Sequence, residues 1–157
     1  MDFFYPNYIN DMWRIFGMVF HGDKDYFVDL SNKTFRLPLI IDLLNSKGIA
    51  IFDTASAVVR LQGNASDKFL QVVRPTDVAA LLRSMPSCHS LCATGEKSAQ
   101  TLCSLFEAKV PSVGEYTTVH DSTLRIYRMP SSSRAYPLAL AKKAEAYATM
   151  FSEIGIL

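Results

Sequence analysis

The sequence predicts an α/β protein in which helices cover both faces of a mostly parallel sheet. Strand-length apolar runs alternate along the chain with segments of helical periodicity, which is the pattern of such sheets. One of these runs, residues 48–53, is apolar without alternation, as in a strand buried on both faces. The chain has 157 residues, 49% of them hydrophobic, so we expect one domain with a sizeable core over residues 1–157.

The first predicted helix begins after Asn10, because an Asn in this place accepts a hydrogen bond from a free amide of the first helical turn. Trp13, Phe16 and Phe20 then recur at helical spacing, which puts them on one face. Gly22 ends this helix.

The remaining elements follow from apolar periodicity and from the positions of Pro and Gly. They are expected in this order: a polar stretch over 23–36, a helix over 39–45 opened by Pro38 and stopped by Lys47 and Gly48, a strand over 48–53, a loop over 54–65, a short helix capped at Ser66 and Asp67 and running through Val73, a helix over 75–85 with Val78, Leu81 and Leu82 facing the core, a strand over 88–93, a helix over 96–106, strands near 116–120 and 124–129, and a helix over 138–154 with Leu140, Ala144, Tyr147 and Phe151 on one stripe.

Composition and charge narrow the classes of function. The formal net charge is +1, so any contact with nucleic acid has to be local. The cysteines number three, which favours reduced thiols. No apolar run reaches the length of about 18 residues that a membrane helix needs, and the first residues lack the pattern of a signal peptide. We therefore expect a cytoplasmic protein without a membrane partner.

No metal centre is expected. Cys88 and Cys92 share a predicted strand at a spacing of four, which separates them by about 13 Å at roughly 3.3 Å per residue. His21, His89 and His120 occur singly. Buried thiols and surface histidines are the alternative reading.

In parallel sheets, ligands bind beyond the carboxyl ends of the strands. In this chain those ends lie at Asp53, at Thr94 and Gly95, and at residues 130–134. A carboxylate such as Asp53 is costly to bury without partners. It therefore either accepts bonds from backbone amides of the next turn or faces a cleft.

The sequence TGEKS, residues 94–98, follows one strand and opens a helix, which suits anion binding at a helix N-terminus. It departs from a Walker loop in order and in glycine spacing, and the glycine pattern of dinucleotide-binding folds is absent, so we expect no nucleotide cofactor. An ordinary strand-to-helix turn is the alternative.

Three hydroxyl residues and an arginine, residues 131–134, follow the last predicted strand. The pattern of a hydrolase nucleophile elbow is absent around them. Small hydroxyls, backbone amides and a guanidinium suit a phosphate of a nucleic-acid backbone. A solvated loop with a helix cap is the alternative.

Four segments carry a family resemblance in chain order: FFYPNYINDMWRI at 3–15, GIAIFD at 48–53 followed by Arg60, Ser66 and Lys68, TGEKSA at 94–99, and PSSS at 130–133. Together they resemble motifs of the uracil-DNA glycosylase superfamily, particularly its hypoxanthine-DNA glycosylase branch. The resemblance implies a three-layer α/β/α fold around a small, mostly parallel sheet. It also implies a monomer that flips a deaminated base out of DNA and hydrolyses its N-glycosidic bond with neither cofactor nor metal.

The resemblance also implies roles for individual residues. Asn10 matches the amide that positions water or contacts the base, and Asp53 matches the acid at the strand end. The other implied residues are those of the base pocket, Tyr5, Pro6, Thr94, Gly95 and Lys97, and those that contact DNA, Arg60, Ser131, Ser132, Ser133 and Arg134.

The chain departs from the family at several places. Thr94 stands where the branch often has Asn, and Arg134 and Tyr136 replace a frequent Pro and Asn. The strand and Gly-Ser/Thr-x-Pro motif that usually precede the aromatic segment are absent. We therefore expect an N-terminally incomplete domain, either from a start site placed too late or from a destabilised truncation.

Three hypotheses remain open on the sequence. The first is a DNA glycosylase, which the presence of Asn10 favours. The second is an inactive member of the same fold that binds nucleic acid or a nucleobase, which the absent first motif and modest charge favour. The third is an unrelated flavodoxin-like binding module, in which Trp13 serves only as core.

Overall fold

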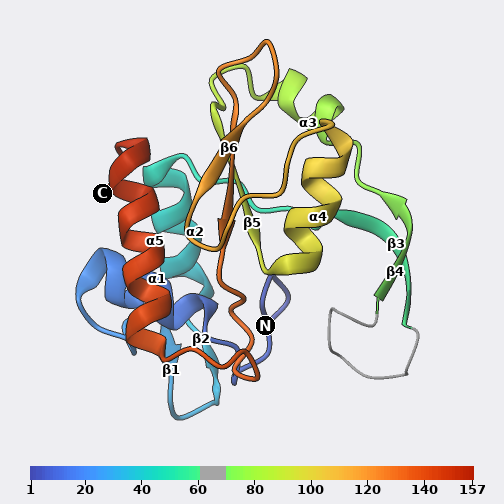
Figure 1. Cartoon of the computed structure of the whole chain (residues 1–157). Coiled ribbons are helices and arrows are strands. Elements are labelled where there is room, and N and C mark those ends of the chain that lie inside the picture. Colours follow the sequence, from blue (N-terminus) through green and yellow to red (C-terminus); the bar gives the residue numbers. More distant parts are fainter. Residues whose placement is uncertain (61–69) are drawn as a thin grey trace. The chain divides into compact units, whose positions relative to one another are not determined.

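The computed structural model describes residues 1–60 and 70–157 of the chain (Figure 1). These residues form two compact units. The first unit combines residues 1–52 with 130–157, and the second comprises residues 53–129. The described part is mixed α/β, with five helices and a small mixed sheet of three strands. The expectation of a single domain over the whole chain stays a prediction.

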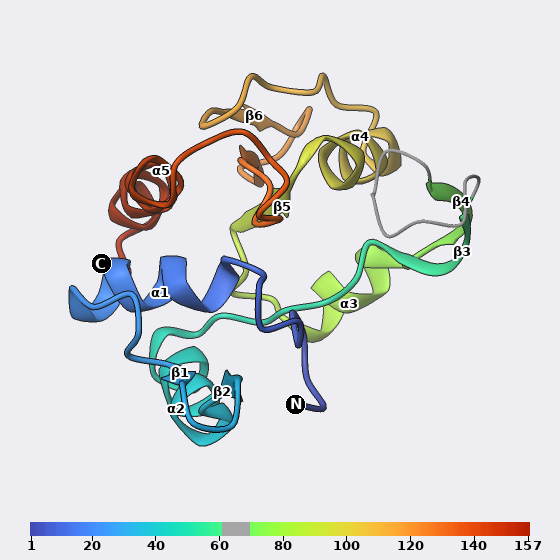
Figure 2. The same ribbon diagram turned by 90° about the horizontal axis from the view of Figure 1, so that it is seen from below.

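The core of the first unit lies between α1 (Met12–His21) and α5 (Leu140–Ile154), which pack side by side (Figure 2). The Phe16 ring centroid lies 5.3 Å from that of Trp13 and 5.7 Å from that of Phe151. These are the apolar faces that the helical spacing predicted. Gly22 ends α1 in the left-handed conformation, with φ of 66°.

A second helix, α2 (Leu37–Lys47), belongs to the same unit and has Pro38 in its first turn. Within the predicted polar stretch, β1 (Val28–Asp29) pairs antiparallel with β2 (Thr34–Phe35). Phe27, Val28 and Phe35 are buried, so this short hairpin adds an apolar surface to the unit.

The second unit is built on a three-stranded sheet in the order β5-β7-β6. The central strand β7 (Arg125–Met129) is parallel to β5 (Ser90–Thr94) and antiparallel to β6 (Tyr116–Thr118). Helix α4 (Glu96–Leu105) contacts β5 and β7 (Figure 1). The core between them consists of Ala93, Ala99, Leu102, Cys103 and Ile126. The expected strands and helix are confirmed here, but the sheet is mixed.

The predicted strand over 48–53 is wrong. These residues have no strand structure, and the Phe52 side chain is 62% exposed. The next strand, β3 (Ala55–Arg60), forms an antiparallel hairpin with β4 (Leu70–Pro75). A continuous apolar run becomes a buried strand only where neighbouring strands satisfy its backbone groups, and none pairs with it in the described residues.

Within the described residues, the hairpin also corrects the loop predicted over 54–65, of which 55–60 are strand, and the short helix predicted through Val73, of which 70–73 are strand. Both strands of the hairpin contain a Val-Val pair, and β-branched residues favour strands over helices. The cap proposed at Ser66 and Asp67 lies outside the described residues. The helix predicted over 75–85 is present as α3 (Val78–Ser84), which Asp77 caps by accepting a bond from the backbone N–H of Ala80 at 3.0 Å.

No helix within residues 1–60 or 70–157 has both the length and the apolar character needed to cross a lipid bilayer.

Gly17 provides a stability test of the first unit. It lies buried within α1, and its carbonyl oxygen accepts a bond from the backbone N–H of Asp23 at 3.2 Å. A Cβ added at Gly17 would collide with the carbonyl oxygen of Asp23. We therefore expect Gly17→Ala to lower the free energy of unfolding in urea by about 1–3 kcal/mol. Helix propensity alone predicts a gain in stability of about 1 kcal/mol. The sign of the measured change therefore distinguishes a steric collision at Gly17 from the effect of propensity.

The matched control is Ala148→Gly in α5, which should cost about 1 kcal/mol through helix propensity. A rise in stability for Gly17→Ala would mean that the turn after α1 does not approach the helix as described.

Candidate functional site

The aromatic segment at the N-terminus is anchored to Trp13. The Trp13 indole Nε1–H donates to the carbonyl oxygen of Phe4 at 3.2 Å. The rings of Phe3 and Tyr5 lie 6.1 and 6.2 Å from the Trp13 ring. Tyr5 is half-buried with φ of 52°, whereas Pro6 is exposed. A left-handed Tyr is unfavourable by about 1–2 kcal/mol, so contacts with Trp13 hold the segment in this shape.

Asn10 lies one residue before the N-cap of α1, which is Asp11 and not Asn10 as the sequence predicted. Asn10 Oδ1 accepts a hydrogen bond from the backbone N–H of Met12 at 2.9 Å. The Nδ2 group makes no hydrogen bond with the described residues, and Oδ1 keeps a second lone pair. The half-buried amide can therefore still donate to, or accept from, a ligand.

The hydroxyl segment after β7 lies against the start of α1. The carbonyl oxygen of Ser132 accepts a bond from the backbone N–H of Asp11 at 2.9 Å. Asp11 directly follows Asn10, so this bond brings the candidate amide and the candidate phosphate-binding segment into one unit.

A buried ion cluster fixes this junction. The Asp11 carboxylate accepts bonds from Arg134 Nη2 at 3.2 Å and from Lys143 Nζ at 3.1 Å. Lys143 Nζ also donates to the carbonyl oxygen of Ser133 at 2.8 Å. Lys143 is 1% exposed and Asp11 is 6% exposed. Because buried charges need partners, Asp11 and Lys143 depend on each other, and Arg134 adds a second cation from its half-exposed position.

The side chains of residues 131–134 differ in what they can contact. Ser131 Oγ and Ser133 Oγ accept bonds from the backbone N–H groups of Ser133 and Ala135, at 3.2 and 3.3 Å. Such turns leave the hydroxyl protons free to be donated outward. The Arg134 side chain is 51% exposed, but Ser132 is buried. Ser131, Ser133 and Arg134 can therefore reach an external ligand, and Ser132 contributes through its backbone.

In the second unit, the turn from β5 to α4 is confirmed. Thr94 pairs with Met129 at the carboxyl ends of the parallel strands, and the Gly95 N–H donates to the carbonyl oxygen of Met129 at 3.0 Å. Gly95 has φ of 92°, which favours glycine.

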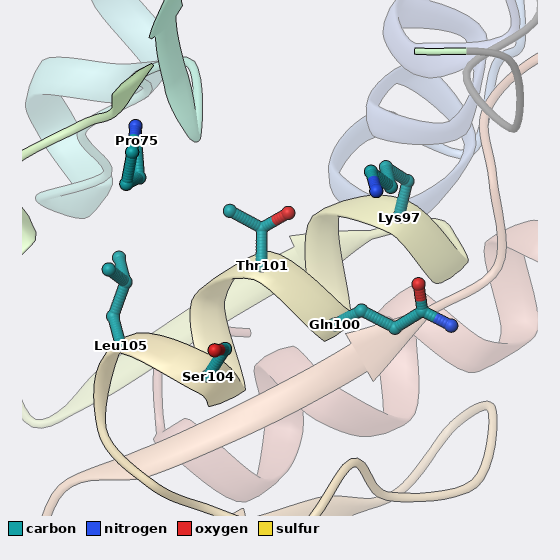
Figure 3. A pocket seen from close by; sticks show the side chains of 6 residues that line it. All are labelled: Pro75, Lys97, Gln100, Thr101, Ser104 and Leu105. Atoms are coloured by element: carbon teal, nitrogen blue, oxygen red, sulfur yellow. The ribbon is translucent and has the colours of Figure 1, made fainter. Parts of the chain in front are cut away.

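Lys97 borders an open hollow of about 340 Å³ (Figure 3). Gln100, Thr101, Ser104 and Leu105 come from the same helix α4, and Pro75 comes from the end of β4. Gln100, Thr101 and Ser104 contribute polar groups to this lining, and Lys97 is its one charged side chain among the described residues.

Asp53 is exposed and does not end a buried strand, so the reason for placing it at a sheet edge is wrong. The only hydrogen bond found at Asp53 among the described residues is to its backbone, whose carbonyl oxygen accepts from Thr76 Oγ1 at 2.6 Å. Arg60 ends β3, and its side chain lies outside the part that is described. Ser66 and Lys68 lie outside it entirely.

Shifted pKa values also occur at groups other than these residues, among them Asp29 and Cys103. A hydrogen bond from the Asn32 side chain, at 2.8 Å, together with the Asn32 backbone N–H, lowers the pKa of the Asp29 carboxyl. Burial raises the pKa of the Cys103 thiol. Within residues 1–60 and 70–157, no three His, Cys, Asp or Glu side chains gather as metal ligands would.

The sequence analysis missed Asp11 and Lys143. A signal for Lys143 was present, because it lies on the α5 stripe with Leu140, Ala144 and Tyr147 at helical spacing. A lysine on an apolar stripe indicates a buried charge that needs a partner. Its partner was not predictable, because Asp11 is 132 positions away in the chain.

None of the protein-family models, curated proteins and solved structures compared with this chain matches it.

The ion cluster gives a second test of stability. We expect Lys143→Met to lower the free energy of unfolding in urea by about 3–5 kcal/mol, because it removes a buried partner of Asp11. The matched control is Lys142→Met, which removes an exposed contact with Glu145 and should cost less than about 1 kcal/mol. Equal effects of these neighbouring substitutions would contradict the buried cluster.

Proposed function

We propose that this chain is a DNA glycosylase of the uracil-DNA glycosylase superfamily, with the three-layer α/β/α fold of that group. Its substrate is a deaminated base, uracil or hypoxanthine, flipped out of DNA. The observation that carries the proposal is the hydrogen bond between the Asp11 N–H and the Ser132 carbonyl oxygen. It joins the Asn10 segment to the hydroxyl segment, and these are the first and last segments that resemble the family.

The reaction needs groups that the first unit supplies. Breaking the bond between the sugar carbon and the base nitrogen develops positive charge on the sugar and negative charge on the base. Water then adds its hydroxyl to the sugar carbon, and its proton goes to the departing base. An amide such as Asn10 is too weak a base to remove that proton early, but it can orient the water when the transition state is already cation-like.

Binding of the substrate's phosphates requires hydrogen-bond donors beside the Asn10 amide. The outward hydroxyl protons of Ser131 and Ser133 and the half-exposed Arg134 guanidinium provide them. Tyr5 supplies an aromatic ring for stacking on the base. The roles of Asp53, Arg60, Thr94, Gly95 and Lys97 rest on the family resemblance alone.

One observation favours a second candidate, an inactive member of the fold that binds nucleic acid or a nucleobase. Asn10 Oδ1 already accepts a hydrogen bond from the Met12 N–H, so only its second lone pair is left to orient water. Binding of a base through the Asn10 Nδ2 group does not require a free lone pair on Oδ1.

The test is strand scission. Oligonucleotides that contain uracil, hypoxanthine or xanthine are incubated with the protein and then treated with alkali, which cleaves at abasic sites. We expect scission, and we expect Asn10→Ala to lower its rate by about 10²–10³-fold, the loss typical of one positioned polar group.

The matched control is Asn7→Ala, since Asn7 Oδ1 makes the same kind of local contact, with the backbone N–H of Ile9 at 3.1 Å. It should keep the activity. Binding without scission would establish the inactive alternative, and neither binding nor scission would refute both.

A further inference from the structure

Arg14 is a buried cation for which the proposed reaction has no use. It lies in the first turns of α1 and is 8% exposed. Its guanidinium carbon lies 4.8 Å from the ring centroid of Tyr8 and 5.6 Å from that of Phe35. Stacking on two aromatic rings favours a guanidinium over an ammonium here.

One end of the guanidinium is fixed by backbone. Arg14 Nη1 donates to the carbonyl oxygen of Tyr8 at 2.6 Å and to that of Asn10 at 3.2 Å. These contacts use both protons of Nη1. They also tie Arg14 to the backbone of the candidate catalytic amide.

The other edge of the guanidinium has no protein acceptor. Nε and Nη2 carry three N–H groups, and within the described residues no acceptor or carboxylate pairs with them. The nearby Asp11 carboxylate is held by Arg134 and Lys143 instead. Nε and Nη2 of Arg14 are not sealed from solvent, so this edge of the guanidinium keeps contact with solvent.

A buried positive charge without a carboxylate is unfavourable, and the free edge has the geometry that holds two oxygens of one anion. We propose that the Nε and Nη2 edge of Arg14 binds a phosphate-class oxyanion through two parallel charge-assisted hydrogen bonds. The source is a DNA phosphodiester or a free phosphate. The DNA source rests on the proposed function, since it puts a backbone phosphate of the substrate beside Asn10. The oxyanion site itself is independent of the proposed function.

The test is titration of the intact wild-type protein with inorganic phosphate, followed by NMR of the arginine Nε–Hε signals at constant ionic strength. We expect the Arg14 signal to shift and saturate, while that of the exposed Arg36 changes little. Chloride in place of phosphate should leave both signals unchanged. Absence of a saturable shift at Arg14 overturns the proposal.

The substitution Arg14→Lys assigns the Arg14 Nε–Hε signal and tests whether the paired N–H donors of the guanidinium are needed. It keeps the charge but loses the paired donors, so the affinity for phosphate, measured by calorimetry, should fall at least about tenfold. Unchanged affinity would overturn the proposal. If this variant fails to fold, the wild-type titration still decides, because it needs no substitution.

An oligonucleotide with a stable abasic analogue separates the two sources. If the oligonucleotide saturates the Arg14 shift at a lower concentration than inorganic phosphate does, the ligand is the phosphodiester. A shift with phosphate alone identifies the free anion and keeps the site. Failure of strand scission together with a phosphate shift at Arg14 refutes the glycosylase and leaves this inference standing.

Discussion

The first unit depends on the neutralisation of one buried carboxylate. Asp11 starts α1, and its charge is balanced by Arg134 from the segment after β7 and by Lys143 from α5. Hydrogen bonds from the Asp11 backbone and from Lys143 Nζ hold the carbonyl oxygens of Ser132 and Ser133. The orientation of the hydroxyl segment thus follows from satisfying these charges, and the accessible groups near Asn10 are positioned as a result.

Local sequence rules predicted most helices well. The hydrogen bond from the Met12 N–H to Asn10, the apolar face of Trp13 and Phe16, and the end at Gly22 are all features set within a few residues, so the sequence alone contains them. The same holds for the turn at Gly95. The strand expected over 48–53 failed for the opposite reason, since a strand depends on partners that can lie anywhere in the chain.

The candidate site was predictable only in part. The motifs singled out Asn10 and residues 131–134 because both kinds of residue have recognisable local chemistry, and the two segments do lie in one unit. They did not reveal Asp11, Lys143 or the free edge of Arg14, because each of these depends on which distant groups meet a buried charge.

The first unit is discontinuous in sequence, which constrains the order in which the protein can fold. Residues 1–52 lack α5 until residues 130–157 join them, and the contact between Asp11 and Arg134 closes a separation of 123 positions. Chain closure over such a distance is entropically costly and slows folding. During synthesis, α1 therefore leaves the ribosome with its Trp13 and Phe16 face uncovered until the last helix is made, a period in which chaperone binding or self-association competes with docking.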